Sequence, residues 1–376
     1  MDRRHFLGAA AAAAAAPYAF AKTGEPGVTD TEILLGQSAV LTGPLAPGAL
    51  AMQGGAKVAF EEANAKGGVA GRKLRLMALD DGFDPARAAA NYEALVKQHQ
   101  VFACVLGVGA SATLAGLPEL KEANMPMIGA TAVVDSAREK LNGIAYFTRA
   151  SQQRECDALV LHLRTLGMRK VALAHIGTPG GQEVLSQVQA AVQKHELEFA
   201  GAAGVAPDGS NAADAGKAVA QLKAQATLMF LSGPAGAAFI KSALANGSAP
   251  AFYGMSILAG DVTAKLLGDQ SSGLAISQVT PYPWDAASAD ANQYRKACEK
   301  AQVPVGYHSY EGYLSGRVLV EALKQTGREL TRARLHAAMR ALKTRVAGVE
   351  FDFNGQHTGS RFVELVRVRP DGKFVR

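Results

Sequence analysis

The chain has 376 residues, which at roughly 100–200 residues per domain is enough for two domains. Hydrophobic residues make up 48% and charged residues 19%, a mixture that fills two globular cores and excludes a disordered chain. The net charge is +6, but Lys and Arg alternate with Asp and Glu along the chain. No basic stripe for nucleic acid results, and we expect no nucleic-acid partner.

The first 21 residues are typical of an export signal. Arg3-Arg4-His5-Phe6-Leu7-Gly8 is a twin-arginine motif, an apolar run extends from Ala9 to Ala16, and Ala19-Phe20-Ala21 is a small-x-small cleavage pattern. The apolar run is shorter than the ~20 residues that span a bilayer. The segment resembles a twin-arginine (Tat) signal, so we expect cleavage after Ala21 and a periplasmic mature protein that folds before export.

Beyond the signal, apolar β-rich runs alternate with amphipathic stretches, which predicts a parallel sheet covered on both faces. In the first set, strands are predicted at 32–39, 73–79, 101–106, 127–129 and 145–148. Helices are predicted between them at 52–66, 85–98 and 113–124. Asp84 is the expected N-cap of the second helix, with Pro85 at its first position.

A second set follows directly. Helices are predicted at 152–166, 182–194, 212–224 and 235–245, and strands at 170–175, 198–205, 227–231, 251–253 and 273–278. Pro281-Tyr282-Pro283-Trp284 then breaks regular structure, as a segment crossing between domains does. Helices are predicted at 287–301, 310–325 and 331–342, and we expect the chain to end in an antiparallel pair of 349–353 with 361–368.

Two α/β sets of similar length predict two doubly wound lobes that face each other across a cleft. We expect lobe I to comprise residues 28–147 and 282–345, and lobe II residues 148–281 and 346–376. Ligands bind beyond the carboxyl ends of the strands in open α/β sheets. The site is therefore expected in the loops that follow these strand ends: Ala39, Leu106, Gly129, His175, Leu231 and Tyr253.

An ordered set of motifs over about residues 28–376 resembles the periplasmic leucine/isoleucine/valine-binding proteins. The motifs are Gly36–Ala39 with Leu41–Pro44, Gly54–Ala56 through Asn64–Arg72, Asp80–Pro85, Pro281–Trp284, Glu311–Tyr313 and Gly359–Val363. The resemblance implies a type I periplasmic binding fold, α/β, with three hinge crossings. It also implies a monomeric binding protein, not an enzyme, that needs no cofactor or metal and delivers a small ligand to an ABC transporter permease.

The resemblance further implies that two loops hold the ligand's carboxylate. These are the loops after the third and fourth strands, and the contacts expected there are Ser111, Ala112, Thr113, Ala130 and Thr131. Ser111 stands where a helix is predicted to begin, and a hydroxyl beside free backbone N–H groups suits an anion. The alternative is that Ser111 is only an N-cap and Thr131 a turn residue. Further ligand contacts are expected from three residues of the other loops: Gln152, Ser256 and Tyr282.

The amino-acid binders that the chain resembles hold the ligand's ammonium with a carboxylate in the loop that here reads Gly254-Met255-Ser256. They also use aromatic residues where this chain has Pro179-Gly180-Gly181 and Ser232–Gly236. A buried ammonium without an acidic partner is costly. Our hypothesis is that the ligand lacks an ammonium group, as a small carboxylic acid does, or that other residues bind it.

Three other functions share some of these sequence features. Gly107-Val108-Gly109-Ala110-Ser111-Ala112 fits a dinucleotide spacing, but the next strand ends without the supporting acid. A hydrolase built on Ser111 would need a base such as His175 from the other lobe. A sensory module that reports ligand occupancy to a receptor would use the same fold.

The three cysteines match no zinc or redox pattern, and we expect them buried and unbridged.

Overall fold

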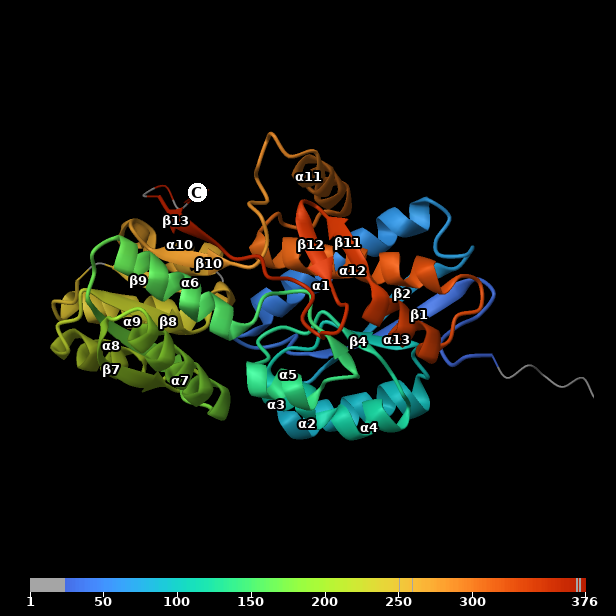
Figure 1. Cartoon of the computed structure of the whole chain (residues 1–376), viewed down its shortest axis with the longest axis horizontal. Helices are drawn as coiled ribbons and strands as arrows, with labels where there is room; N and C mark the ends of the chain where they lie inside the picture. The colour runs from blue at the N-terminus through green and yellow to red at the C-terminus, as the bar shows by residue number, and fades with distance from the viewer. Residues whose placement is uncertain (1–23, 250, 259, 370, 372) are drawn as a thin grey trace, which may run out of the picture.

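The computed structural model describes residues 24–376 except 250, 259, 370 and 372. The expected signal at residues 1–21, with its cleavage site, lies outside the described residues. The chain folds into two α/β lobes that lie side by side (Figure 1). Within the described part of the chain, no helix is both long and apolar enough to cross a membrane.

Lobe I is built on a parallel five-stranded sheet with the order β2-β1-β3-β4-β5. Leu35 of β1, which has a neighbouring strand on each side, lies opposite Leu76 on one side and Ala103 on the other, and its side chain is buried. The strands are β1 (Glu32–Ala39), β2 (Lys73–Asp80), β3 (Ala103–Val105), β4 (Met127–Ile128) and β5 (Ala145–Tyr146). Their connecting helices are α1 (Ala46–Ala65), α2 (Pro85–Glu93), η1 (Ala94–Gln98), α3 (Ala110–Ala115), α4 (Leu117–Glu122) and α5 (Asp135–Lys140).

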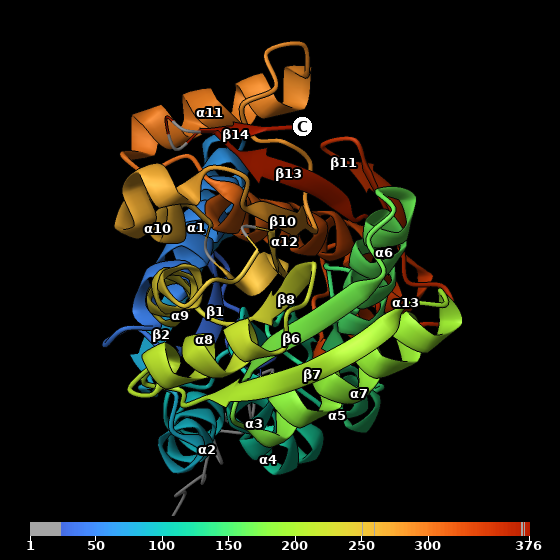
Figure 2. The same ribbon diagram turned by 90° about the vertical axis from the view of Figure 1, so that its left-hand side faces the viewer.

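Lobe II is built on a seven-stranded sheet with the order β14-β13-β10-β9-β8-β6-β7, which faces the viewer in Figure 2. Five strands are parallel, and the last two are antiparallel additions. The strands are β6 (Lys170–Ile176), β7 (Glu198–Val205), β8 (Ala226–Phe230), β9 (Phe252–Gly254), β10 (Ala275–Gln278), β13 (Glu364–Val368) and β14 (Phe374–Val375). The helices are α6 (Gln152–Thr165), α7 (Pro179–Lys194), α8 (Ala212–Gln221), α9 (Gly233–Ala245), η2 (Ser256–Leu258), α10 (Gly260–Leu267) and η3 (Gly268–Ser271).

The remaining elements return the chain to lobe I. They are α11 (Ala289–Ala301), α12 (Tyr307–Thr326), α13 (Arg332–Ala341), β11 (Lys343–Val346) and β12 (Val349–Asp352). Side chains of all three helices join the apolar core of lobe I, as do Phe351 and Phe353 around β12. The chain therefore passes between the lobes three times: after β5, after β10 and after β12.

The end of the chain differs from the sequence prediction. Strand β12 pairs with β11 in a separate hairpin, whereas β13 joins β10 in the large sheet, so the expected pairing of 349–353 with 361–368 is wrong. Phe351 and Phe353 are buried in the core of lobe I. The alternation of apolar residues alone does not show in which lobe such side chains are buried. In the domain division that we propose, the third crossing lies between 353 and 364, not at 345/346.

Two predicted helices have different boundaries in the structure. Helix α1 begins at Ala46, six residues before the predicted start, and the predicted helix 113–124 is divided into α3 and α4 at Gly116. The N-cap of α2 is Asp84, as predicted, and its side chain accepts a 2.8 Å hydrogen bond from the Arg87 backbone N–H. All three cysteines are buried and unbridged, as predicted.

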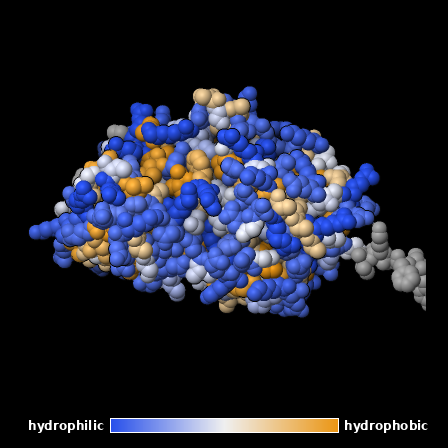
Figure 3. All heavy atoms as spheres, viewed as in Figure 1, coloured by the Kyte–Doolittle hydropathy of each residue, from blue (hydrophilic) through white to orange (hydrophobic). Residues whose placement is uncertain are grey.

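The two lobes are packed against each other in this conformation. One apolar cluster runs across their boundary, with Val133 of lobe I and Val188 of lobe II among its members. On the outer side of this boundary, the Ser136 backbone N–H donates to Glu183 Oε1 at 2.9 Å. The face of the molecule shown in Figure 3 is largely hydrophilic, and its hydrophobic residues are gathered in small patches.

Candidate functional site

The candidate site lies where four strands of the two sheets end. In lobe I the strand order changes direction between β1 and β3, and in lobe II between β6 and β8. Val40 follows β1 and Val108 follows β3, while Ile176 ends β6 and Ser232 follows β8. All four residues line one hollow between the lobes. The crevice at such a switch point is where α/β sheets bind ligands, and here two crevices face each other.

The hollow is mostly apolar and small. About 100 Å³ of space remains in it, close to the volume that about three water molecules occupy in liquid water. This volume is well below the roughly 300 Å³ of a small-molecule pocket. A ligand of several heavy atoms therefore enters only when the lobes part. The lining residues from both lobes are Val40, Leu45, Gly48, Ala49, Met52, Phe83, Val108, Thr131, Ala132, Ile176, Ser232, Ile257 and His308.

Thr131 is held at this position by the loop that follows β4. Gly129 begins the turn with φ 76°, and a Cβ there would lie 2.8 Å from the Ser315 Cβ, so only glycine fits. Ala132 completes the turn with φ 53°. Backbone hydrogen bonds of 2.8 and 3.0 Å tie Thr131 to Gly107 and Gly109 in the neighbouring loop. The threonine side chain therefore has a fixed direction at the floor of the hollow.

Beneath Thr131 lies a buried charged network centred on Arg149, whose side chain is 2% exposed. Arg149 Nη1 donates to Thr131 Oγ1 at 2.5 Å and to Glu311 Oε1 at 3.1 Å. Arg149 stands in the first crossing between the lobes, after β5, and Glu311 stands in the first turns of α12. These contacts attach the guanidinium to lobe I.

The other half of the guanidinium contacts lobe II. Arg149 Nη2 donates to Glu155 Oε1 at 3.0 Å and to the Ser256 hydroxyl. Glu155 lies in the first turn of α6, where the helix dipole favours an acid. It also accepts hydrogen bonds from the Ser256 backbone N–H at 2.9 Å and from Ser277 Oγ at 2.7 Å. One arginine thus joins hydroxyl groups from both lobes.

The charges in this network balance one another. Burial disfavours the charge on Arg149, but the carboxylates of Glu311 and Glu155 outweigh this effect and raise its pKa above the usual value. Burial, and then the nearby Arg149 charge, lower the pKa of the adjacent Arg138 to about 10. Both arginines are therefore charged at neutral pH. With two guanidinium groups beside two carboxylates, the floor of the hollow has no excess positive charge.

The predicted site residues occupy different positions in the structure. Thr131 lines the hollow, and Ser256 is buried in the Arg149 network one residue before Ile257. Ser111 is exposed at the start of α3, outside the residues that line the hollow. The others are buried away from that lining: Ala112, Thr113, Ala130 and Gln152.

Two polar side chains in that buried group have no hydrogen-bond partner among the described residues. They are the Thr113 hydroxyl and both amide atoms of Gln152. Sequence reasoning did not assign a role to Arg149 or Glu155, and it used Glu311 only as part of the motif Glu311–Tyr313. One sequence feature could have indicated that Arg149 is buried. It is a charged residue in a stretch without other charges, after Phe147-Thr148 and before Ala150.

Tyr282, a predicted ligand contact, lies instead in an aromatic cluster at the second crossing. Its hydroxyl donates to the Phe374 backbone carbonyl at 2.8 Å. Trp284 stacks on Phe374 with ring centroids 5.7 Å apart, and Tyr307 meets both rings edge-on. Glu364 of β13 lies beside this cluster, and its buried Oε1 has no hydrogen-bond partner among the residues that the structure describes. The cluster therefore packs the C-terminal strand of lobe II against the start of α12.

Glu364 is expected to make stability depend on pH near neutrality. Burial raises its pKa to about 7, against a weaker opposing effect of Arg376, whose Nε lies 3.8 Å away, while Asp285 adds to the rise. The folded protein holds this proton up to pH ~7 and the unfolded chain only up to ~4.5. The stabilising effect is thus fully present below pH ~4.5 and is lost as pH rises through 7.

The test compares wild type with Glu364→Gln by denaturant unfolding at pH 5 and pH 8. Between pH 5 and pH 8 we expect the free energy of unfolding of wild type to fall by about 1–2 kcal/mol more than that of the variant, allowing for partial screening. Glu329→Gln, at an exposed carboxylate, is the control and should follow wild type. Identical pH dependence in wild type and Glu364→Gln would contradict this assignment.

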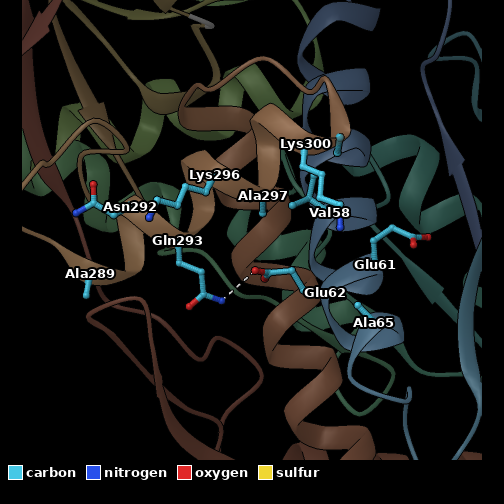
Figure 4. Close-up of a pocket in the computed structure, with 11 residues that line it drawn as sticks. Val58, Glu61, Glu62, Ala65, Ala289, Asn292, Gln293, Lys296, Ala297 and Lys300 are labelled. Atoms are coloured by element: carbon cyan, nitrogen blue, oxygen red, sulfur yellow. Dashed lines mark hydrogen bonds between the residues drawn. The ribbon is translucent and has the colours of Figure 1, made fainter.

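A larger hollow lies outside the cleft. It has a volume of about 880 Å³ and is an open groove between α1 and α11, both parts of lobe I (Figure 4). Gln293 Nε2 donates to Glu62 Oε1 across it at 3.0 Å. A ligand in this groove would contact only one lobe, so it could not favour closure of the two lobes.

The described residues assemble neither a Ser111–His175 pair nor a metal-binding cluster. His175 Nδ1 lies 3.0 Å from the adjacent Ile176 carbonyl, and no hydrogen bond joins it to Ser111. No group of three or more His, Cys, Asp or Glu side chains in the described ranges is placed to hold a metal ion.

Comparison with known proteins places the chain in a family. The sequence model of the periplasmic binding proteins matches residues 32–373. A possible leucine/isoleucine/valine-binding protein from Rhodopirellula baltica is 27% identical, with a TM-score of 0.83 over 92% of this chain and 97% of that one. An extracellular ligand-binding receptor from Verminephrobacter eiseniae is also 27% identical, with a TM-score of 0.83 over 92% and 100%.

A branched chain amino acid ABC transporter protein from Thermus thermophilus, with bound valine, shares the fold. It is 18% identical, with a TM-score of 0.81 over 93% of this chain and 96% of that one. No similar sequence was found among curated proteins. These findings confirm the resemblance seen in the sequence motifs. The chain belongs to the periplasmic binding protein family and has its type I fold.

Proposed function

We propose that this protein is a monomeric, exported solute-binding protein that captures a small carboxylate-bearing ligand between its lobes and delivers it to an ABC transporter permease. The observation that carries the proposal is the hollow at the carboxyl ends of β1, β3, β6 and β8, which both lobes line. The ligand binds to lobe I, and lobe II then closes over it. Export through a twin-arginine signal at residues 1–21, with cleavage after Ala21, is part of the same proposal.

The lining supports a ligand with an apolar body and one oxygen-bearing end. The apolar side chains provide contact area, and Thr131 provides a hydroxyl at a fixed position. No carboxylate is among the residues that line the hollow, and Glu311 behind Thr131 is already paired with Arg149. An ammonium group would have no free acidic partner there. The proposal therefore favours a carboxylic acid without an ammonium group over an amino acid.

The test is calorimetric titration with leucine and 4-methylpentanoate, which share a side chain and differ in the ammonium group, and with a panel of other aliphatic and aromatic acids. We expect wild type to bind an acid of this kind with micromolar affinity, about −8 kcal/mol. Thr131→Val should weaken that binding by about 10–100-fold, because a hydrogen bond to a charged group is lost.

Ser111→Ala is the comparison variant. Because the Ser111 side chain is exposed outside the hollow, we expect its effect to stay within about twofold. Tighter binding of leucine than of 4-methylpentanoate would contradict the ligand class. Delivery to a permease is tested by ligand uptake in cells that lack the gene; normal uptake with lost ligand signalling would instead indicate a sensory module.

A further inference from the structure

We propose that Arg149 is the positioning residue of the ligand site: its guanidinium fixes the Thr131 hydroxyl so that the hydroxyl proton points to a ligand oxygen. This inference rests on the proposed function, because it assumes a ligand oxygen in the hollow above Thr131. It adds a role for a residue that does not itself line the hollow.

Arg149 determines which way the Thr131 hydroxyl donates. A guanidinium N–H is always a donor, so the Thr131 oxygen must accept from Nη1, at 2.5 Å. The hydroxyl proton must then point to another acceptor. Within the described residues, the acceptor recorded for it is Glu311 Oε1 at 3.5 Å, which is the weak limit of such a bond. A ligand oxygen in the hollow would be the better partner.

The second hydroxyl on the same guanidinium behaves differently. Ser256 also accepts from Arg149, through Nη2, but its own proton goes to Glu155 Oε1 at 2.9 Å. Ser256 is therefore satisfied without a ligand, and Thr131 is the hydroxyl that stays available. Nη1 contacts lobe I and Nη2 contacts lobe II, so one rigid guanidinium connects the Thr131 hydroxyl to groups of both lobes.

Arg138 provides a matched control for burial and charge. Its side chain is 1% exposed and lies at the same crossing. It donates to the backbone carbonyls of Val133 at 2.9 Å, Arg149 at 3.3 Å and Ala150 at 3.0 Å, and not to the Arg149 side chain or to Thr131. A Lys at either position keeps the charge but cannot donate in two directions from one rigid plane. Only the substitution at 149 should change the direction of the Thr131 hydroxyl.

The experiment titrates wild type, Arg149→Lys and Arg138→Lys with 4-methylpentanoate and with the neutral alcohol of the same skeleton, 4-methylpentan-1-ol. If another acid of the panel binds more tightly, that acid and its alcohol are used. We expect Arg149→Lys to weaken acid binding by about tenfold or more and alcohol binding by less than about threefold. Arg138→Lys should lower thermal stability while leaving the ratio of acid to alcohol affinity unchanged.

A double-mutant cycle separates positioning from general damage. If Arg149 acts through Thr131, Arg149→Lys should have almost no further effect on acid affinity once Thr131 is Val. Additive losses in the double variant, or the same acid-to-alcohol ratio in Arg149→Lys as in wild type, would overturn the inference. Failure of wild type to bind any acid in the panel would instead count against the proposed function.

Glu311→Gln supplies a second variant that leaves Arg149 in place, should Arg149→Lys not fold. It removes a negative charge 3.5 Å from Thr131 Oγ1, behind the hydroxyl that would contact the ligand's carboxylate. We expect acid affinity to rise severalfold, because like-charge repulsion in a buried site is reduced, with alcohol affinity unchanged. Unchanged or weaker acid binding in this variant would overturn the inference.

Discussion

Replacing Arg149 by Met is expected to lower the free energy of unfolding by about 3–5 kcal/mol, because it leaves buried carboxylates without their cation. Arg149 lies 3.0 Å from Glu155 Oε1 and 3.1 Å from Glu311 Oε1, and all three side chains are buried. Removing a guanidinium of this kind costs far more than breaking an exposed pair. Denaturant unfolding monitored by circular dichroism at pH 7 measures the difference.

Two further variants identify the cause of that loss. Adding Glu155→Gln and Glu311→Gln to Arg149→Met should recover part of the stability, since no uncompensated charge then remains in the network. Arg164→Met breaks the partly exposed pair with Glu196 and should cost less than about 1 kcal/mol. A triple variant less stable than Arg149→Met alone would show that unpaired charge is not the cause.

Gly55→Ala is expected to destabilise the protein by about 3 kcal/mol or more through overpacking. Helices α1 and α12 approach each other most closely at this residue: a Cβ on Gly55 would lie 1.7 Å from the Ser309 carbonyl oxygen. On the facing helix, a Cβ on Gly312 would lie 1.9 Å from the Met52 carbonyl oxygen. Because backbone atoms meet on both sides, the helices must separate to accept even one methyl group.

Gly54→Ala, one residue earlier on the same helix, is the matched control. A Cβ there would meet only the Val303 side chain, at 3.1 Å, and that side chain can shift. The helix gains from losing a glycine, by about 0.5–1 kcal/mol, so the net change should be small. Thermal unfolding of the two variants measures the contrast, and equal loss in both would show that the close backbone contact does not limit packing.

The order of strands and helices was predictable from the sequence because each depends on local patterns. Apolar runs such as 32–39 and 170–175 match β1 and β6, and the Asp84 cap was read from a single residue type before Pro85. The location of the hollow also followed from topology, because strand ends in parallel sheets meet at one edge. Helix starts and the C-terminal pairing were less predictable, since packing between distant segments sets them.

The chemistry of the cleft was decided by contacts between distant parts of the chain. Arg149 meets Ser256, 107 residues away, and Glu311, 162 residues away. No local pattern reports such pairing. Spacing likewise could not distinguish Ser111, which is exposed, from Thr131, which a glycine turn directs into the hollow. Periodicity is a property of neighbouring residues and so predicts the two lobes, whereas the balance of buried charge exists only after the lobes have come together.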